Sequence, residues 1–286
     1  MQKIKVDQIN TKQRLDIVVG RHLPGISRTS IRGLIEQGKI LVNNKLQKAG
    51  YKLKEYDVIT IDYDENSENI ETALDLPIIY EDDDCIVIDK PIGLLTHSKG
   101  TLNVEATVAS FILPKTRNLT GNRAGIVHRL DRATSGIIIC AKNLESLKWL
   151  QKQFANRKVK KTYYAIIKVG LSPSEAIIDM PIQRNSKKPK QFMVGVNGKP
   201  AITKYKIIKS NKNYSLVELT PQTGRTHQLR VHLNQVKHPI VGDLIYNGEP
   251  ASRLFLHAYL LEITLPNKTR QVFISKFPVA FNEMVK

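Results

Sequence analysis

The nonapeptide 128–136, His-Arg-Leu-Asp-Arg-Ala-Thr-Ser-Gly, constrains the fold more than any other stretch of this chain. Apolar residues flank it at 125–127 and at 137–141. Both apolar runs are too short for a typical helix and are typical of buried strands. We therefore expect Asp131 to lie on a turn between two buried strands.

Two arginines set the electrostatic surroundings of Asp131. Arg129 lies two residues before it, and Arg132 follows it directly. Positive charge at these positions favours the ionised carboxylate, which suits a nucleophile or a base better than an acid. A structural ion pair that rigidifies the loop is the alternative interpretation of the same residues.

The nonapeptide also resembles a family signature. Its pattern His-Arg-Leu-Asp-x-x-Thr-Ser-Gly matches the catalytic motif of the RluA-type pseudouridine synthases at every specified position. The resemblance implies that Asp131 is the catalytic residue of an enzyme that isomerises specific uridines in RNA. Members of the family that carry an S4 module act mostly on large-subunit ribosomal RNA, so we expect that substrate here, and the resemblance implies a reaction without a metal or an organic cofactor.

Two further segments extend the resemblance toward the C-terminus. In the segment 161–165, Lys-Thr-Tyr-Tyr-Ala, the spacing makes Tyr163 the counterpart of the family's active-site tyrosine. Because side chains alternate along a strand, only one of the two neighbouring tyrosines can face Asp131. The segment 224–228 resembles the Gly-Arg-x-His-Gln motif, whose arginine accompanies the aspartate, so we expect Arg225 to pair with Asp131.

The resemblance also indicates which residues of this region meet RNA. A flipped base leaves an empty space in its helix, and Arg129 is placed to occupy that space and to hold phosphates. The segment 90–94, Lys-Pro-Ile-Gly-Leu, resembles a family segment near the active site. The RNA-binding residues expected here are Lys90, His128, Arg129 and Arg132.

A small module precedes this region. Its apolar spacing predicts two helices and then strands at 39–42 and 58–61, with Ser27 as the N-cap of the second helix. The order of these elements and the segment 27–43 resemble the S4 RNA-binding domain. A solvated basic helix face is the alternative interpretation. The residues expected to meet phosphates in this module are Arg28, Arg32 and Lys39.

These patterns predict two domains and a linker. We expect an S4-like domain of α/β type at 1–62, an acidic linker at 63–77 and a catalytic domain at 78–286. The catalytic domain should be α+β, the pseudouridine synthase fold that the resemblance implies, with a mixed, largely antiparallel central sheet. Its helices should pack outside the sheet, and its cleft should lie near Asp131.

The charge of the chain narrows the choice of partner. The 286 residues include 44 Lys and Arg against 26 Asp and Glu, a net charge of +18, which favours a nucleic acid as partner. No apolar run approaches the roughly 20 residues of a membrane span. Cys85 and Cys140 lie in apolar runs and fit free buried thiols of a cytoplasmic protein. We expect a monomer that binds ribosomal RNA or its assembly particle.

Other classes of function fit these residues less well. A non-catalytic RNA-binding or ribosome-assembly protein gives no reason for Asp131, Tyr163 and Arg225 to occur together. A pseudouridine synthase acting on tRNA remains an alternative. A glycosidase normally uses two carboxylates at the scissile bond, and only one stands out here. His227 and His232 are five residues apart, which is not the spacing of a helical metal-ligand pair.

Overall fold

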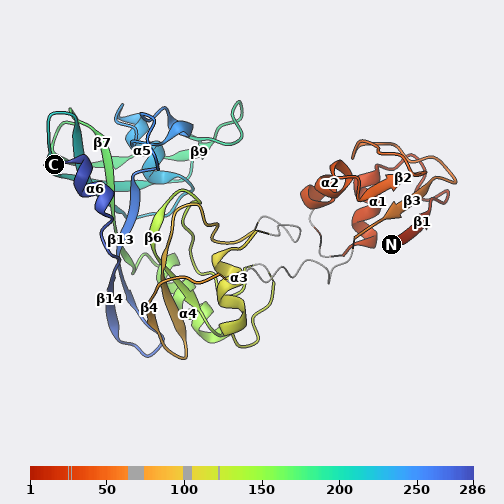
Figure 1. Cartoon of the computed structure of the whole chain (residues 1–286), viewed down its shortest axis with the longest axis horizontal. Coiled ribbons are helices and arrows are strands. Elements are labelled where there is room, and N and C mark those ends of the chain that lie inside the picture. The colour runs from red at the N-terminus through yellow and green to blue at the C-terminus, as the bar shows by residue number, and fades with distance from the viewer. Residues whose placement is uncertain (25, 27, 64–73, 99–104, 122) are drawn as a thin grey trace. The chain divides into compact units, whose positions relative to one another are not determined.

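The computed structural model describes the chain except for residues 25, 27, 64–73, 99–104 and 122 (Figure 1). The expected N-cap Ser27 and most of the expected acidic linker therefore lie outside the described residues. The chain forms two compact units. The first holds the N-terminal elements, and the second holds Leu74–His97 together with Thr107–Lys286.

The first unit is a small α/β module with one apolar core. Its sheet is antiparallel and has the strand order β1-β3-β2. The two expected helices and the two expected strands are present, and the structure adds a strand at the N-terminus that pairs with β3. The elements are β1 (Gln2–Lys5), α1 (Leu15–His22), α2 (Arg28–Glu36), β2 (Ile40–Val42) and β3 (Val58–Ile61).

The second unit is built on a nine-stranded mixed sheet of order β4-β5-β6-β13-β7-β12-β11-β8, with β14 paired to β13. Among the described strands, β6 and β13 form its one parallel pair. This confirms the expected α+β fold with a largely antiparallel sheet. The strands are β4 (Ile78–Glu81), β5 (Cys85–Lys90), β6 (Ser135–Ala141), β7 (Lys160–Lys168), β8 (Glu175–Asp179), β11 (Ile202–Ser210), β12 (Tyr214–Pro221), β13 (Leu256–Thr264) and β14 (Arg270–Ile274).

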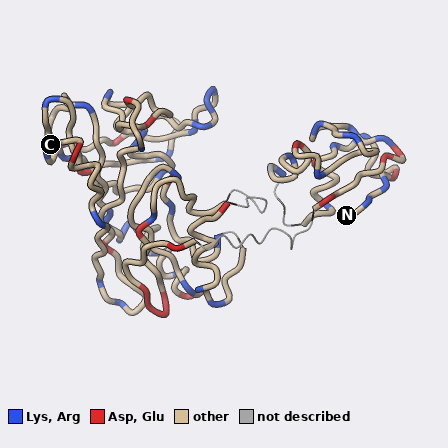
Figure 2. Tube along the Cα trace, viewed as in Figure 1, with Lys and Arg blue, Asp and Glu red and all other residues tan. Residues whose placement is uncertain are grey.

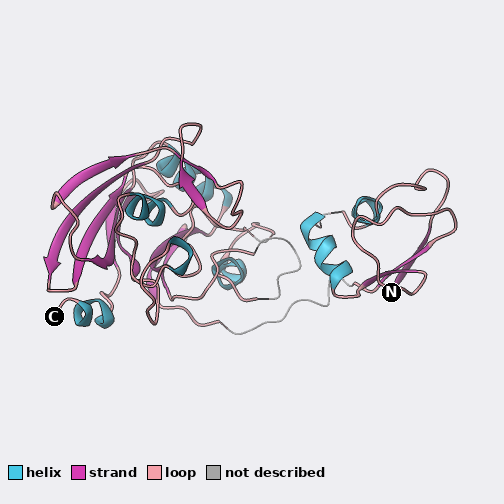
Figure 3. Cartoon of the chain, turned by 90° about the horizontal axis from the view of Figure 1, so that it is seen from above, coloured by secondary structure: helices cyan, strands magenta, loops and turns pink. Residues whose placement is uncertain are grey.

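The helices lie outside this curved layer of strands (Figure 3). A separate hairpin of two short strands, β9 and β10, completes the unit. None of the helices among the described residues is long and apolar enough to cross a membrane. The remaining elements are α3 (Val108–Ile112), η1 (Leu113–Lys115), α4 (Leu144–Ala155), β9 (Ile182–Arg184), β10 (Phe192–Val194), α5 (Gln228–Gln235), η2 (Leu244–Tyr246) and α6 (Val279–Met284).

Strand β6 is buried along its whole length and on both faces. Ile137 and Ile139 share an apolar cluster with Leu150 of α4. On the opposite face, Ile138 shares a second cluster with Ile112 of α3. Two-sided burial explains the continuous apolar run in the sequence. It also fixes the start of β6 and, with it, the loop that carries Asp131.

The prediction of a strand at 125–127 is wrong. These residues form an isolated bridge, between Ile126 and Cys140, and Gly125 has a φ of +71°. A Cβ atom at Gly125 would overlap the carbonyl oxygen of Ala141. The chain therefore crosses the end of β6 at close range, and no side chain other than glycine fits there without strain. Asp131 consequently follows a loop and precedes a strand.

Glycine is also required at the start of β6, and this is testable. Gly136→Ala should lower the free energy of unfolding of the second unit by about 3 kcal/mol or more. The φ of +109° strains any L side chain, and a Cβ atom would overlap the backbone of Ala258. Urea unfolding followed by the fluorescence of Trp149, the single tryptophan, measures the loss.

The matched control is Gly93→Ala in the same unit. Gly93 has a φ of +82°, but a Cβ atom added to it would have no neighbouring heavy atom within 4 Å. Gly93→Ala should therefore lower the free energy of unfolding only through the strain of its positive φ, by about 1–2 kcal/mol. Equal losses for the two variants would show that the close contact with Ala258 contributes nothing.

Candidate active site

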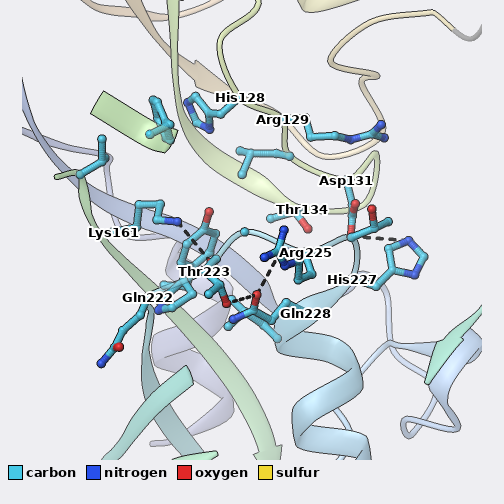
Figure 4. A pocket seen from close by; sticks show the side chains of 18 of the residues that line it. His128, Arg129, Asp131, Thr134, Lys161, Gln222, Thr223, Arg225, His227 and Gln228 are labelled. Atoms are coloured by element: carbon cyan, nitrogen blue, oxygen red, sulfur yellow. Dashed lines mark hydrogen bonds and ion pairs between the residues drawn. The ribbon is translucent and has the colours of Figure 1, made fainter. Parts of the chain in front are cut away.

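A cavity of about 480 Å³ opens beside the start of β6. Its walls come from the loop that carries Asp131, from the first residues of β7 and from the segment 221–230 between β12 and α5 (Figure 4). Cavities of about 300–1,000 Å³ hold small ligands in proteins. The sheet therefore brings three distant segments of sequence around a space for one small group.

Asp131 lies at this cavity with its side chain 19% exposed. Its Oδ2 atom is 3.4 Å from Nη1 of Arg230 on α5 and 3.7 Å from Nε2 of His227. The carboxylate is therefore held between a guanidinium and an imidazole while one side stays open to the cavity. This arrangement fixes the orientation of the carboxylate and leaves it accessible to a ligand in the cavity.

Arg230 is itself held by a buried ion pair. Its Nε and Nη2 atoms donate to the two carboxylate oxygens of Asp243, each at 2.7 Å. The guanidinium also lies over the ring of Tyr246, 5.1 Å from the ring centroid. Both charged side chains are buried, and two parallel hydrogen bonds fix the orientation of a guanidinium. Arg230 therefore presents its remaining nitrogen, Nη1, to Asp131 in a fixed direction.

The expected pairing of Arg225 with Asp131 is wrong, because the structure brings Arg230 to that position. Arg225 also lines the cavity, but its Nε donates to the carbonyl oxygen of Pro200 at 3.0 Å. The two arginines belong to the same motif and are five residues apart. The helix begins only at Gln228, so the first arginine stays on the preceding turn and the second projects from the helix.

The turn before α5 is held by the glutamine of the same motif. Oε1 of Gln228 accepts hydrogen bonds from the Thr223 hydroxyl at 2.7 Å and from the Arg225 backbone N–H at 3.0 Å. Its Nε2 donates to the carbonyl oxygen of Ile202 at 2.9 Å. Gln228 thus ties the turn to β11 and fixes where α5 starts, which in turn sets the position of Arg230.

His227 is oriented by a short chain of hydrogen bonds. The Tyr246 hydroxyl accepts the backbone N–H of Phe192 at 2.9 Å and lies 2.8 Å from Nδ1 of His227. A hydroxyl that accepts this N–H can donate its own proton to Nδ1, and in that tautomer the imidazole proton is on Nε2, facing Asp131. Burial lowers the pKa of His227, so the ring is neutral near pH 7. The sequence motif contained this histidine but gave no sign of its partner.

The two adjacent tyrosines of β7 lie on opposite faces of the sheet, as alternation predicts. Tyr163 lines the cavity together with Asp131. Tyr164 instead donates to Glu218 at 3.2 Å and packs edge-on against Tyr259. Burial, and next the Asp131 carboxylate, raise the pKa of Tyr163, so its phenol is protonated near pH 7.

Lys90, expected to bind RNA, is fully buried, and this expectation is wrong. Its ammonium donates to the carbonyl oxygens of Pro91 at 2.8 Å, Leu94 at 3.0 Å and Arg132 at 3.4 Å. Burial lowers the pKa of Lys90 to about 8, while Asp131 acts in the opposite direction. Lys90 therefore ties its own loop to the loop of Asp131 and is not available to a phosphate.

His128 also differs from its expected role. It lines the cavity, but its Nε2 accepts the backbone N–H of Ile139 at 3.1 Å and its ring stacks on Phe154 at 4.6 Å. Burial, with a smaller contribution from Lys161, lowers the pKa of His128 to about 3. An uncharged ring that is bonded to β6 cannot attract a phosphate as a cation, so His128 supports the loop.

The other expected RNA-binding residues are exposed. Arg129 lines the cavity near Asp131 (Figure 4). Arg132, the residue after Asp131, is exposed. In the first unit, Arg32 and Lys39 are exposed. Arg28 is exposed too, but its Nε donates to the buried Asp16 at 3.1 Å.

The cavity is strongly basic. Asp131 is the one carboxylate among the described residues that line it. A positively charged hollow of this kind attracts a polyanion and concentrates it near the carboxylate. The basic residues that line it are Arg129, Arg157, Lys161, Arg225 and Arg230.

The chain is similar to proteins of one family along most of its length. Residues 84–235 match the family model described as RNA pseudouridylate synthase, and residues 13–59 match the S4 domain. A protein of Borreliella burgdorferi named "Ribosomal large subunit pseudouridine synthase D" is 38% identical over 94% of this chain and 87% of its own length. A protein of the same name from Nitrosomonas europaea is 34% identical over 93% of this chain and 81% of its own length.

Solved structures give the same picture of the second unit's fold. The structure named "Human RNA Pseudouridylate Synthase Domain Containing 1" superposes with a TM-score of 0.60 at 27% identity. The superposition covers 71% of this chain and 84% of the human chain. Most of the fold of this chain is thus also found in a human protein.

The buried pair of Arg230 and Asp243 predicts a large stability effect. Arg230→Met should lower the free energy of unfolding by about 3–5 kcal/mol, because it leaves the Asp243 carboxylate buried without its partner. Adding Asp243→Asn removes the uncompensated charge and should recover much of this loss. Urea unfolding of both variants measures the difference.

An exposed ion pair supplies the control for this experiment. Arg117 and Asp83 are 2.9 Å apart, with side chains 66% and 87% exposed. Arg117→Met should cost about 1 kcal/mol at most. If Arg230→Met lowered the free energy of unfolding no more than this control does, the ion pair with Asp243 would not stabilise the site.

Proposed function

The chain belongs to the family of RNA pseudouridylate synthases, and we propose that it isomerises specific uridines of large-subunit ribosomal RNA with Asp131 as the catalytic residue. Family membership makes the chain a pseudouridine synthase. The observation that carries the rest is the isolation of Asp131, which is the one carboxylate among the described residues of a basic cavity. Pseudouridine synthesis needs a single such group.

Two kinds of observation support ribosomal RNA as the substrate. Relatives that are 34–38% identical along most of this chain carry names that specify the large ribosomal subunit. The chain also has an S4 domain and a net charge of +18, and its Lys and Arg residues are spread over both units (Figure 2). A polyanion of the size of ribosomal RNA can contact many of these residues together.

The reaction rearranges one nucleotide without loss of atoms. The bond from N1 of uracil to C1′ of ribose breaks, the base turns, and a bond from C5 to C1′ forms. A proton leaves C5 and a proton is taken up at N1. Asp131 would act at the sugar, either as a nucleophile at C1′ or as a base that removes a sugar proton. Both routes begin from the carboxylate, and Nη1 of Arg230 lies 3.4 Å from its Oδ2 atom.

Tyr163 is proposed as the surface on which the uracil rests. It lines the cavity beside Asp131, and aromatic rings commonly stack on flipped bases. Its raised pKa makes the phenol a poor proton acceptor in the free enzyme. We therefore give Tyr163 the stacking role first, and assistance to proton removal at C5, after C5 has bonded to C1′, second.

Exposed arginines would hold the RNA around the flipped nucleotide. Arg129 lies at the cavity and can fill the space that the base leaves, while Arg132 can contact neighbouring phosphates. Arg225 lines the cavity and is proposed to contact the substrate, although it does not hold Asp131. Flipping a base costs a few kcal/mol, and such contacts offset that cost.

The first unit would supply a second area of contact with RNA. Arg32 and Lys39 are exposed on α2 and on the turn that follows it. Arg28 shares its guanidinium between solvent and the buried Asp16, whose pKa is lowered to about 2 chiefly by its hydrogen bond with Arg14. We propose that Arg28, Arg32 and Lys39 contact phosphates, and that residues 1–62 bind RNA while residues 78–286 catalyse. A monomeric state and a cytoplasmic location stay predictions.

Release of tritium tests this proposal. The substrate is a transcript of large-subunit ribosomal RNA that carries tritium at C5 of its uridines. The wild-type enzyme should release tritium, and Asp131→Asn should lower the release rate at least about 10³-fold, because it removes the group that acts on the sugar. RNA binding by this variant should stay unchanged, since the amide keeps the size of the side chain.

The matched control is Asp83→Asn, which neutralises an exposed aspartate outside the cavity. It should react like the wild type. Equal loss of RNA binding and of activity in Asp131→Asn would show that Asp131 is structural. Release from tRNA but not from ribosomal RNA would move the substrate to tRNA. No release from either RNA would contradict the proposed substrate.

A further inference from the structure

Lys161 is a charged residue of the cavity to which the proposed function has given no role. It is the second residue of β7 and precedes Tyr163 by two positions, so both side chains lie on the same face of the strand. Both line the cavity, and Figure 4 shows Lys161 on the side of the cavity opposite Asp131. Lys161 is therefore inside the site yet distant from the carboxylate.

The ammonium of Lys161 has few hydrogen-bond acceptors among the described residues. It makes one hydrogen bond to the described residues, to the carbonyl oxygen of Thr223 at a long 3.4 Å. An ammonium has three donors, so most of its capacity is unused. Burial lowers the pKa of Lys161 to about 8, and no ion pair with a carboxylate of the described residues offsets this burial. A half-buried cation of this kind is costly unless a ligand completes its contacts.

The position of Lys161 indicates which part of a substrate it meets. A nucleotide whose sugar lies at Asp131 and whose base rests on Tyr163 must direct the far edge of that base away from Asp131. Residues two apart on a strand are separated by about 6.6 Å, a span that a pyrimidine ring on Tyr163 can bridge. The exposed arginines at the mouth of the cavity are better placed for the phosphates.

We propose that Lys161 donates a hydrogen bond to a carbonyl oxygen of the uracil and stabilises the negative charge that the base carries during its turn. This role rests on the proposed function. When the bond from N1 to C1′ breaks, its electron pair stays on N1, and the charge spreads to the oxygens at positions 2 and 4. The charge disappears when C5 bonds to C1′. C5 then loses its proton and N1 takes one up, and these two changes leave the base neutral. A cation fixed in a partly water-excluded site stabilises such charge efficiently.

Lys161→Met tests this role against a neighbour on the same strand. Lys160 points to the opposite face, is 71% exposed and forms an ion pair with Glu262 at 3.3 Å. At saturating RNA, Lys161→Met should lower the single-turnover rate of tritium release about 10²–10³-fold. Lys160→Met removes the same charge and should leave that rate unchanged. Both variants should bind the RNA transcript with wild-type affinity.

The dependence of kcat/KM on pH supplies a second readout. The protonated form of Lys161 is the active one, so kcat/KM of the wild type should fall as the pH rises through about 8. Lys161→Arg keeps its charge at every accessible pH. It should recover part of the rate that Lys161→Met loses, and its kcat/KM should stay constant through this range.

Other groups near Lys161 would give a different pattern. His128 has a pKa lowered to about 3 and Tyr163 a raised pKa, so neither titrates near pH 8. Lys90, next to Asp131, has a pKa lowered to about 8 and could produce the same fall. A fall caused by Lys90 would persist in Lys161→Arg, and that result would overturn the assignment to Lys161. The other charged groups that line the cavity are Arg129, Asp131, Arg157, Arg225 and Arg230.

Three further results would overturn the inference. Weaker RNA binding with an unchanged saturated rate would make Lys161 a phosphate contact. A lowered melting temperature without recovery in Lys161→Arg would make it structural. An unchanged rate would exclude any role in the reaction. Failure of the proposed function is recognised separately, because the wild type would then release no tritium from ribosomal RNA.

Discussion

Burial of β6 on both faces is the constraint on which the catalytic unit depends. Its alternate side chains belong to different apolar clusters, one with α4 and one with α3, and its edges pair with β5 and β13. Gly136, at the start of the strand, lies so close to the backbone of Ala258 that no side chain fits there, and a shift by one residue would bring a side chain into this contact. The loop before it is therefore fixed, and Asp131 with it.

The site balances one carboxylate against many cations. Arg230 is held by a buried carboxylate, Asp243, and this second aspartate sets the direction in which the guanidinium meets Asp131. The remaining cations divide by burial. Exposed arginines suit contacts with phosphate, whereas the half-buried Lys161 suits a ligand that enters the cavity. Charge, burial and position together thus distinguish the residues proposed to hold the RNA backbone from Lys161, which is proposed to contact the base.

Residue type alone was a poor guide to the roles of Lys90 and His128. Both lie in segments that resemble family motifs, and both carry groups that commonly bind phosphate. In the structure each is used to hold the loop of Asp131, through carbonyl oxygens in one case and a backbone N–H in the other. Sequence does not show whether a basic side chain faces solvent or the interior, since that depends on which loop lies opposite.

The sequence by itself determined the family, the fold class, the two helices and the two later strands of the first unit, and the position of Tyr163 on the face opposite Tyr164. These follow from local patterns: apolar periodicity, strand alternation and short motifs. Tertiary structure decided that Arg230 contacts Asp131 in place of Arg225, and that 125–127 cross the end of β6 without forming a strand. Both outcomes depend on where α5 begins and on how closely two backbones approach, and contacts between segments distant in sequence set these distances.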